Sequence, residues 1–217
     1  MPDGRRAQNK LEKQSRIHAA AAELLDRHGF ANVTTQQIAD RADVAIGTLF
    51  RYASTKSELL LMVYNDRYRQ AIESGRAQVS ADDGAVPSIL ALIAPLVVAS
   101  REFAENAAAY QRELLYGDPT ERYRSEGLRL TVELQDLFEV VLTRSISASP
   151  VTAVAARTLS DIVHLEIARA PIEETTAERM LVVLGQQTEL IVAGLHVFGN
   201  TFAPAGSVAA TPTSSTK

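Results

Sequence analysis

Apolar residues recur along this chain with the spacing of an α-helix, and no segment sustains the alternation of apolar and polar residues that is typical of a β-strand. The first apolar stripe begins at Ile17, repeats at i+3, i+4, i+7 and i+8, and ends at Leu25. Gly29 follows it as an expected C-terminal cap. Residues 1–8 are polar and are expected to fray. The pattern predicts an all-α protein.

Capping residues mark where further helices begin. Two short helices are expected near residues 35–42 and 45–53. Thr55 and Glu58 form a T-x-x-E sequence, the form of a capping box, which opens a longer helix to about residue 77. A polar break at residues 80–84 is a candidate domain boundary. Beyond it, helices are predicted near residues 86–101, 103–116, 119–147, 151–169 and 175–198.

Prolines account for the breaks between the later helices, at Pro119, Pro150 and Pro171. Pro119 is expected in the first turn of its helix, where its missing N–H group is not needed. Residues 201–217 are mostly Ala, Pro, Ser, Thr and Gly with one charge. Such a composition has too little apolar surface to offset chain entropy, so we expect a disordered tail.

Residues 34–60 read TTQQIADRADVAIGTLFRYASTKSELL. Two short helices joined by a tight turn and followed at once by a capped third helix are typical of a helix-turn-helix. Thr34 or Thr35 is a suitable N-cap for the first of them. The residues expected to share a small core are Ile38, Ala39, Ala42, Val44 and Leu49. Those left facing outward on the second helix are Ile46, Gly47, Thr48, Phe50, Arg51 and Tyr52, a mixture that suits the major groove of DNA.

This segment resembles the tetracycline-repressor (TetR) family of bacterial transcriptional regulators. The matching positions are Thr34, Thr35, Ile38, Ala39, Ala42, Val44, Gly47, Thr48, Leu49, Phe50, Tyr52, Lys56, Leu59 and Leu60. The preceding segment, residues 17–30, also matches the first helix of the family. The resemblance covers about residues 15–62. It implies a three-helix DNA-binding domain over residues 1–60, a helical ligand-binding and dimerisation domain over 61–200, the tail 201–217, and about nine helices.

The resemblance also implies roles for individual residues. Thr35 and Gln36 would meet a phosphate at a helix N-terminus. Tyr52 and Lys56 would contact the sugar-phosphate backbone, and Phe50 would pack on a sugar or a thymine methyl. The residues implied to face base edges are Ile46, Gly47, Thr48 and Arg51. Gly47 costs helix stability, on the order of 1 kcal/mol relative to Ala, but lets the backbone approach DNA.

Three positions depart from the family pattern. Asp43 stands where glycine is usual, and Asp tolerates a positive φ better than most residues, so the turn is expected to survive. Ala45 removes a hydroxyl that would cap the helix and meet a phosphate. Phe50 replaces a frequent tyrosine and therefore has no hydroxyl to donate to phosphate.

Charge is distributed unevenly. Residues 1–69 carry 11 Lys and Arg against 8 Asp and Glu, a net +3, whereas residues 70–217 carry 11 against 18, a net −7. A basic front on an acidic body suits a protein that presents one end to a polyanion. The basic residues Arg5, Arg6, Lys10 and Lys13 form either an arm that reaches DNA or a solvated basic terminus.

Composition and motifs argue against other classes of protein. The chain has no cysteine, no apolar signal segment and no uninterrupted apolar run of about 20 residues, so we expect a cytoplasmic protein without disulfides or a membrane span. No catalytic motif, cofactor motif or metal site is recognised. His164 and Glu166 are two residues apart and point to different faces of a helix, which makes them a poor metal pair.

The resemblance implies an effector pocket and a dimer in the later helices. The pocket candidates are Tyr64, Tyr68, Phe103, Tyr110, Tyr116, Tyr123, Phe138, His164 and Glu166. The apolar residues available for a homodimer are Leu159, Ile162, Val163, Ile167, Leu181, Val182, Leu184, Ile191, Leu195 and Phe198, although the same residues can instead pack within one chain. An apolar pocket suits a lipophilic or aromatic molecule.

The leading hypothesis is a regulator, usually a repressor in this family, that a small-molecule inducer releases from a palindromic operator in double-stranded DNA. A second hypothesis is a helix-turn-helix regulator without an inducer, controlled by a protein partner or acting architecturally. A third is a helical enzyme with an appended DNA-binding module, for which the sequence offers no catalytic constellation.

Overall fold

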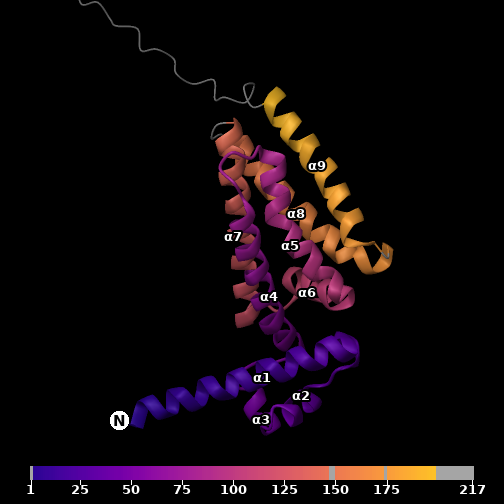
Figure 1. Ribbon diagram of the computed structural model, residues 1–217. Helices are drawn as coiled ribbons and strands as arrows, with labels where there is room; N and C mark the ends of the chain where they lie inside the picture. Colours follow the sequence, from indigo (N-terminus) through magenta and orange to yellow (C-terminus); the bar gives the residue numbers. More distant parts are fainter. Residues whose placement is uncertain (1, 147–149, 174, 199–217) are drawn as a thin grey trace, which may run out of the picture.

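The computed structural model describes residues 2–146, 150–173 and 175–198, and within these ranges every regular element is an α-helix (Figure 1). The helices are α1 (Pro2–Asn32), α2 (Thr35–Arg41), α3 (Ile46–Leu49), α4 (Lys56–Gln78), α5 (Ala85–Glu102), α6 (Ala104–Tyr116), α7 (Arg122–Ile146), α8 (Pro150–Glu173) and α9 (Ala177–Phe198). The predicted all-α fold, with about nine helices, is confirmed.

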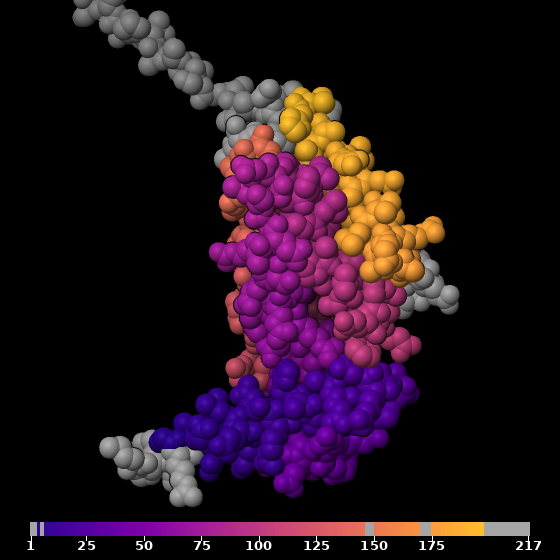
Figure 2. Space-filling view, in the orientation of Figure 1, coloured from indigo at the N-terminus to yellow at the C-terminus, as the bar shows by residue number. Residues whose placement is uncertain are grey.

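The molecule has a head and a body. Helix α1 lies across one end of the body, with α2 and α3 on its far side, and α4 rises from this head into the body (Figures 1 and 2). Within the body, α4 packs against α5, α6 and α7, while α8 packs against α6 and α7, and α9 lies along α5. One helix therefore belongs to both parts of the molecule.

Helix α4 is the most deeply buried segment because its first turns face the head and the body together. Every residue from Glu58 to Asn65 is buried. Thr55 caps the helix by accepting from the Glu58 backbone N–H at 3.0 Å, as predicted. The Glu58 side chain accepts from the N–H of Ser54 rather than that of Thr55, so the reciprocal bond of the capping box is displaced by one residue.

Several predicted boundaries were wrong, each for a local reason. Helix α1 starts at Pro2, ahead of the apolar stripe that begins at Ile17, because residues 5–16 are mostly good helix formers (Arg, Ala, Gln, Lys, Leu and Glu) that carry no apolar stripe to reveal them. Pro119 lies in a turn before α7, where Asp118 accepts from the Thr120 N–H at 2.8 Å. Helix α8 continues past Pro171, so the predicted break there is absent. The predicted tail, residues 201–217, lies outside the described residues.

Two helices, α5 and α9, are long and apolar enough by composition to cross a membrane. In this fold α5 packs against both α4 and α9, and 44% of the segment Ala85–Glu102 is buried inside the protein. The buried face includes Ile89, Leu92, Ile93, Leu96 and Val97. The apolar character of α5 is thus accounted for by its place in the core of the body.

The contact between α4 and α5 requires a glycine. A Cβ added at Gly75 would overlap the Leu92 carbonyl oxygen and lie 2.9 Å from the Leu92 Cα. Both obstacles are backbone atoms, so the helices themselves would have to separate.

We therefore expect Gly75→Ala to destabilise the protein by about 1–3 kcal/mol, the usual range for overpacking a core. The free energy of unfolding is to be measured by urea denaturation. Gly4→Ala is the matched control, because a Cβ there meets nothing within 4 Å. If the two variants were equally stable, the close approach of α4 and α5 would be wrong.

Candidate nucleic-acid interface and internal cavity

The helix that precedes the turn is fixed by a capping box. Thr34 accepts from the Gln37 backbone N–H at 3.2 Å, and the Gln37 side chain accepts from the Thr34 N–H at 2.8 Å. Of the two threonines predicted as caps, Thr34 is therefore the cap. Thr35 occupies the first position of α2 with a half-buried side chain, and Gln36 beside it is exposed.

The turn between α2 and α3 has the conformation expected from the sequence. Asp43 adopts φ +52°, in the left-handed region, as predicted for a residue that stands where glycine is usual. Its carboxylate pairs with Arg16 of α1 at 3.2 Å. Ala45 occupies the N-cap of α3 and makes no side-chain capping bond, which confirms the loss expected there.

The small core of the head is formed as predicted. Ile38, Ala39, Ala42 and Leu49 are buried and Val44 is half-buried, and they join Ile17 and other apolar residues of α1 in one cluster. This core fixes which face of α3 is left outside. Gly47 and Arg51 are exposed, Phe50 is 45% exposed, and Ile46 and Thr48 are half-buried.

Two candidate DNA-contacting residues also hold the head together. The Tyr52 hydroxyl donates to the Lys10 carbonyl at 3.3 Å, and Lys56 Nζ donates to the Val33 carbonyl at 2.9 Å. Lys56 also lies 4.5 Å from the centre of the Phe30 ring. Their predicted contacts with the DNA backbone stay predictions, alongside these roles within the protein.

Lys10, Lys13, Arg51 and Tyr52 line a groove between the N-terminal part of α1 and α3. The Arg51 side chain makes no hydrogen bond or ion pair with any described residue, and the same holds for the Lys13 side chain. The sequence left Lys10 and Lys13 either in an arm that reaches DNA or in a solvated basic terminus, and both lie on α1 beside the end of α3. The side chains of Arg5 and Arg6 lie outside the described residues.

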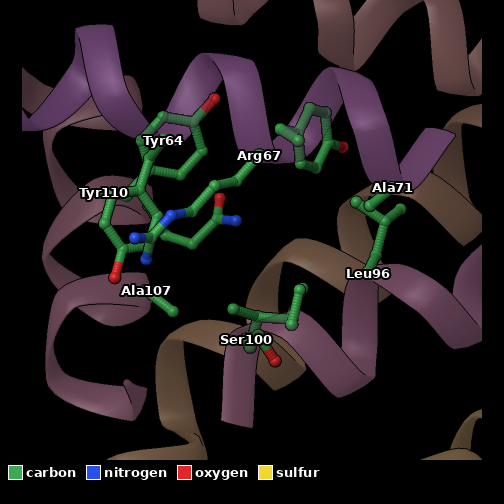
Figure 3. A pocket seen from close by; sticks show the side chains of 11 residues that line it. Tyr64, Arg67, Ala71, Leu96, Ser100, Ala107 and Tyr110 are labelled. Carbon is green, nitrogen blue, oxygen red and sulfur yellow. The ribbon is translucent and has the colours of Figure 1, made fainter. Parts of the chain in front are cut away.

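The body contains a narrow cavity of about 40 Å³ between α4, α5, α6 and α8. Figure 3 shows Tyr64, Arg67 and Ala71 on α4 facing Leu96 and Ser100 on α5. The other lining residues are Tyr68, Ala99, Ala107, Tyr110, Gln111 and Ile167. The space has room for a few water molecules, well short of the 300 Å³ or more of a typical ligand pocket.

The cavity brings together some of the predicted pocket residues and leaves others apart. Tyr64, Tyr68 and Tyr110 line it, and His164 contacts Tyr68. Tyr116 is 83% exposed, Phe138 and Tyr123 are buried outside the lining, and Glu166 lies beside Arg169, 3.9 Å away. Phe103 packs near Arg67 without lining the cavity.

The sequence reading missed three polar residues of the cavity, Arg67, Ser100 and Gln111. For Arg67 a signal was present, because it stands three residues after Tyr64 and therefore on the same side of α4. A charged residue among the buried positions of one helix indicates a polar group inside the body.

A chain of hydrogen bonds crosses the cavity wall. The His164 Nδ1–H donates to the Gln111 Oε1 at 2.8 Å, and His164 Nε2 accepts from the Tyr68 hydroxyl at 3.1 Å. This assignment follows because the amide oxygen of Gln111 only accepts. Burial lowers the pKa of His164 to about 4, so the imidazole is neutral at pH 7. Burial also raises the pKa of Tyr68, which keeps its hydroxyl protonated.

Head and body are joined by polar contacts around the end of α1. Arg67 of α4 donates from Nη2 to both carboxylate oxygens of Asp26, at 2.8 and 2.7 Å. Asn106 of α6, itself buried, accepts from the Phe30 N–H at 2.6 Å and donates to the Leu25 carbonyl at 2.9 Å. These two bonds lie on either side of Gly29, whose φ of +74° breaks the helical path.

The exposed apolar residues of the late helices overlap the set predicted for the dimer only at Val182. Leu159, Val163, Ile167, Leu184 and Leu195 are buried within the single chain, so the alternative of packing within the monomer applies to them. The exposed apolar residues on α8 and α9 are Val154, Leu165, Val182, Leu190 and Val197. Of the predicted set, Val182 is exposed, Ile162, Leu181 and Ile191 are half-buried, and the side chain of Phe198 lies outside the described residues.

The head carries a helix-turn-helix, and comparison with known proteins supports this assignment. Residues 17–63 match the family described as bacterial regulatory proteins, tetR family. The chain is 34% identical over 76 residues to the HTH-type transcriptional repressor KstR of Mycobacterium tuberculosis, which covers 35% of this chain and 34% of that protein. KstR of Rhodococcus jostii is 34% identical over 65 residues, covering 30% and 31%.

Solved structures match over most of the fold. FadR of Thermus thermophilus, a TetR-family transcriptional repressor in complex with lauroyl-CoA, has a TM-score of 0.66 at 23% identity, over 83% of this chain and 93% of that one. FadR of Bacillus subtilis, in complex with stearoyl-CoA, has a TM-score of 0.62 at 18% identity, over 84% and 99%. The chain aligns with about a third of the length of the curated relatives. The match to the tetR family thus covers the helix-turn-helix, and the likeness to the solved structures extends to the fold of the helical body.

The buried histidine makes stability depend on pH. The pKa of His164 is lower in the folded protein, about 4, than the usual value near 6.5 in the unfolded chain. The unfolded state therefore binds the extra proton first, and stability falls as the pH drops from 6.5 toward 4.

Between pH 7 and pH 5 the wild type should lose about 2 kcal/mol more stability than His164→Gln, which has no imidazole to protonate. Urea unfolding at both pH values, at one protein concentration, measures this difference. Parallel losses in the two proteins would mean that His164 is not held neutral by burial.

Proposed function

We propose that this protein is a ligand-responsive DNA-binding transcriptional repressor. The observation that carries the proposal is the outward face of α3, where exposed Gly47 and unpaired Arg51 stand beside a groove lined by Lys10 and Lys13. A short helix with a glycine on its exposed face and cationic side chains beside it fits the major groove, which the two phosphate backbones flank.

The side chains of this face suit distinct DNA contacts. Arg51 has the donors to bond a guanine edge, while Thr48 and Ile46 suit contact with thymine methyls. Thr35 and Gln36 begin α2, where backbone N–H groups favour a phosphate. Phe50 supplies an exposed apolar surface for a sugar or a methyl group. Phosphate contacts position the head, and the α3 residues supply sequence preference.

We propose that two copies of the chain pair through α8 and α9. The exposed residues Val182, Leu190 and Val197 recur along one side of α9, and α8 adds Val154 and Leu165. Such apolar faces on two late helices suit a four-helix interface with a second copy. A dimer would present two heads to half-sites about 34–36 Å apart in a palindromic operator.

We propose that the effector is a small molecule with an apolar body, which enters the cavity beneath α4. The lining is aromatic and aliphatic apart from Arg67, Ser100 and Gln111. The acyl-CoA complexes of two structural relatives support an apolar ligand class. Because the cavity holds only about 40 Å³, a ligand must part the helices that enclose it, and α4 leads directly to the head.

The narrow cavity also favours a second candidate, a regulator controlled by a protein partner without a small effector. Operator binding measured against a library of apolar small molecules separates the two. Release from DNA by a molecule that also raises the melting temperature supports the effector. No release, with a folded dimer, supports the partner. A cytoplasmic, non-enzymatic role fits both candidates.

The operator is to be found by selecting bound sequences from random DNA, where a palindrome is expected. Gly47→Ala should then weaken operator binding at least tenfold, because the added methyl meets DNA. It should leave the fold intact, because a Cβ at Gly47 meets no protein atom within 4 Å. Fluorescence anisotropy measures the affinity, and unchanged affinity would remove α3 from the interface.

The dimer is tested at Leu190, which is 75% exposed on α9. Leu190→Asp should convert the dimer to monomers, since a charge would be buried in an apolar interface. Sedimentation equilibrium measures the mass. Leu115→Asp on α6, where Leu115 is 61% exposed, is the matched control and should leave the dimer unchanged. A Leu190→Asp protein that stayed dimeric would place the interface elsewhere.

A further inference from the structure

Arg67 is the one charged residue among the described residues that line the cavity. It reaches the cavity from α4, close to Tyr64, whose ring centre lies 4.9 Å from the guanidinium carbon (Figure 3). An unpaired cation beside an apolar space would be costly, so the structure must supply an anion. That anion comes from the head.

The pairing of Arg67 leaves most of its hydrogen-bonding capacity unused. Both bonds to Asp26 start from the single nitrogen Nη2. A guanidinium carries five N–H donors in a fork that matches two oxygens of a carboxylate. Donor groups are thus available for a second anion.

The partner of Arg67 lies on the other side of the joint. Asp26 belongs to α1, while Arg67 belongs to α4 and to the cavity wall. Their side chains are 30% and 29% exposed, so the pair is screened by water and is exchangeable for another anion. An anion that took Arg67 from Asp26 would act on the head directly.

We propose that the effector carries one carboxylate on an apolar body, and that this carboxylate binds Arg67 in place of Asp26 and frees α1 from α4. A single cation in the lining matches a monovalent anion. The apolar lining around it, which includes Leu96, Ala107 and Ile167, matches the body of the molecule. This inference rests on the proposed function, and it assigns to Arg67 both ligand selection and the link to DNA binding.

The test uses the full-length protein and two probes of equal length, sodium decanoate and 1-decanol, titrated by calorimetry. The wild type should bind decanoate at least tenfold more tightly than decanol. Arg67→Met should lose that preference while still binding decanol. Arg69→Met is the matched control, since Arg69 lies on the same helix and pairs with Asp66 and Glu126 but does not line the cavity.

Removing the competing carboxylate gives a second, opposite expectation. Asp26→Asn should bind decanoate three- to tenfold more tightly than the wild type, with decanol unchanged, because Arg67 no longer has to leave an anion. Asp161→Asn, which alters an exposed pair within α8, should bind both probes as the wild type does. The Asp26 variant keeps the inference testable if Arg67→Met does not fold.

Equal binding of the two probes, no binding of either, or affinities that Arg67→Met and Asp26→Asn leave unchanged would each overturn the inference. Operator binding separates this failure from that of the proposed function. Release from DNA by uncharged molecules alone would remove the carboxylate and keep the effector. Binding of decanoate through Arg67 without release from the operator would keep the site and contradict ligand control of DNA binding.

Discussion

The position of the head depends on the joint where α1 meets α4 and α6. Asp26 and Arg67 form one charged contact there and His18 and Asp66 form a second, while Asn106 forms the buried contact, with bonds to Leu25 and Phe30. A partly exposed ion pair contributes at most about 1 kcal/mol, and each neutral hydrogen bond about 1 kcal/mol. These terms are small beside the apolar cores on either side. The head can therefore change its angle to the body while both remain folded.

Helix α4 connects the cavity in the body with the DNA-binding head. Its first turns belong to a continuous apolar cluster that includes Ile17 of the head and Leu92 of the body. Its middle turns supply Tyr64, Arg67 and Tyr68 to the cavity, and Gly75 holds its far end against α5. Because α4 packs in both the head and the body, a change in the cavity wall reaches α1 through this helix. Since the cavity holds only about 40 Å³, any ligand of useful size must cause such a change.

The helix-turn-helix could be predicted from the sequence almost residue by residue, because its caps, turn and core follow local rules. As predicted, Thr34 caps α2, Asp43 adopts the positive φ of the turn, and Leu49 is buried in the small core. Two features depended on information that local patterns lack. The N-terminal part of α1 is helical without an apolar stripe. The role of Arg67 depends on Asp26, 41 residues away. The late helices show the same limit, because apolar periodicity identifies a helix face but does not say whether the same chain or a second copy covers it.

The central claim is that the Asp26–Arg67 contact sets the position of the head. The chain has no cysteine, so a single Gln36→Cys substitution on exposed α2 gives one spin label per chain. Pulsed electron paramagnetic resonance then measures the distance between the two heads of a dimer. In the absence of ligand we expect one narrow distance distribution for the otherwise wild-type protein. Asp26→Asn should shift or broaden it, and Asp161→Asn, which alters an exposed pair within α8, should not. Superimposable distributions for all three proteins would contradict the account.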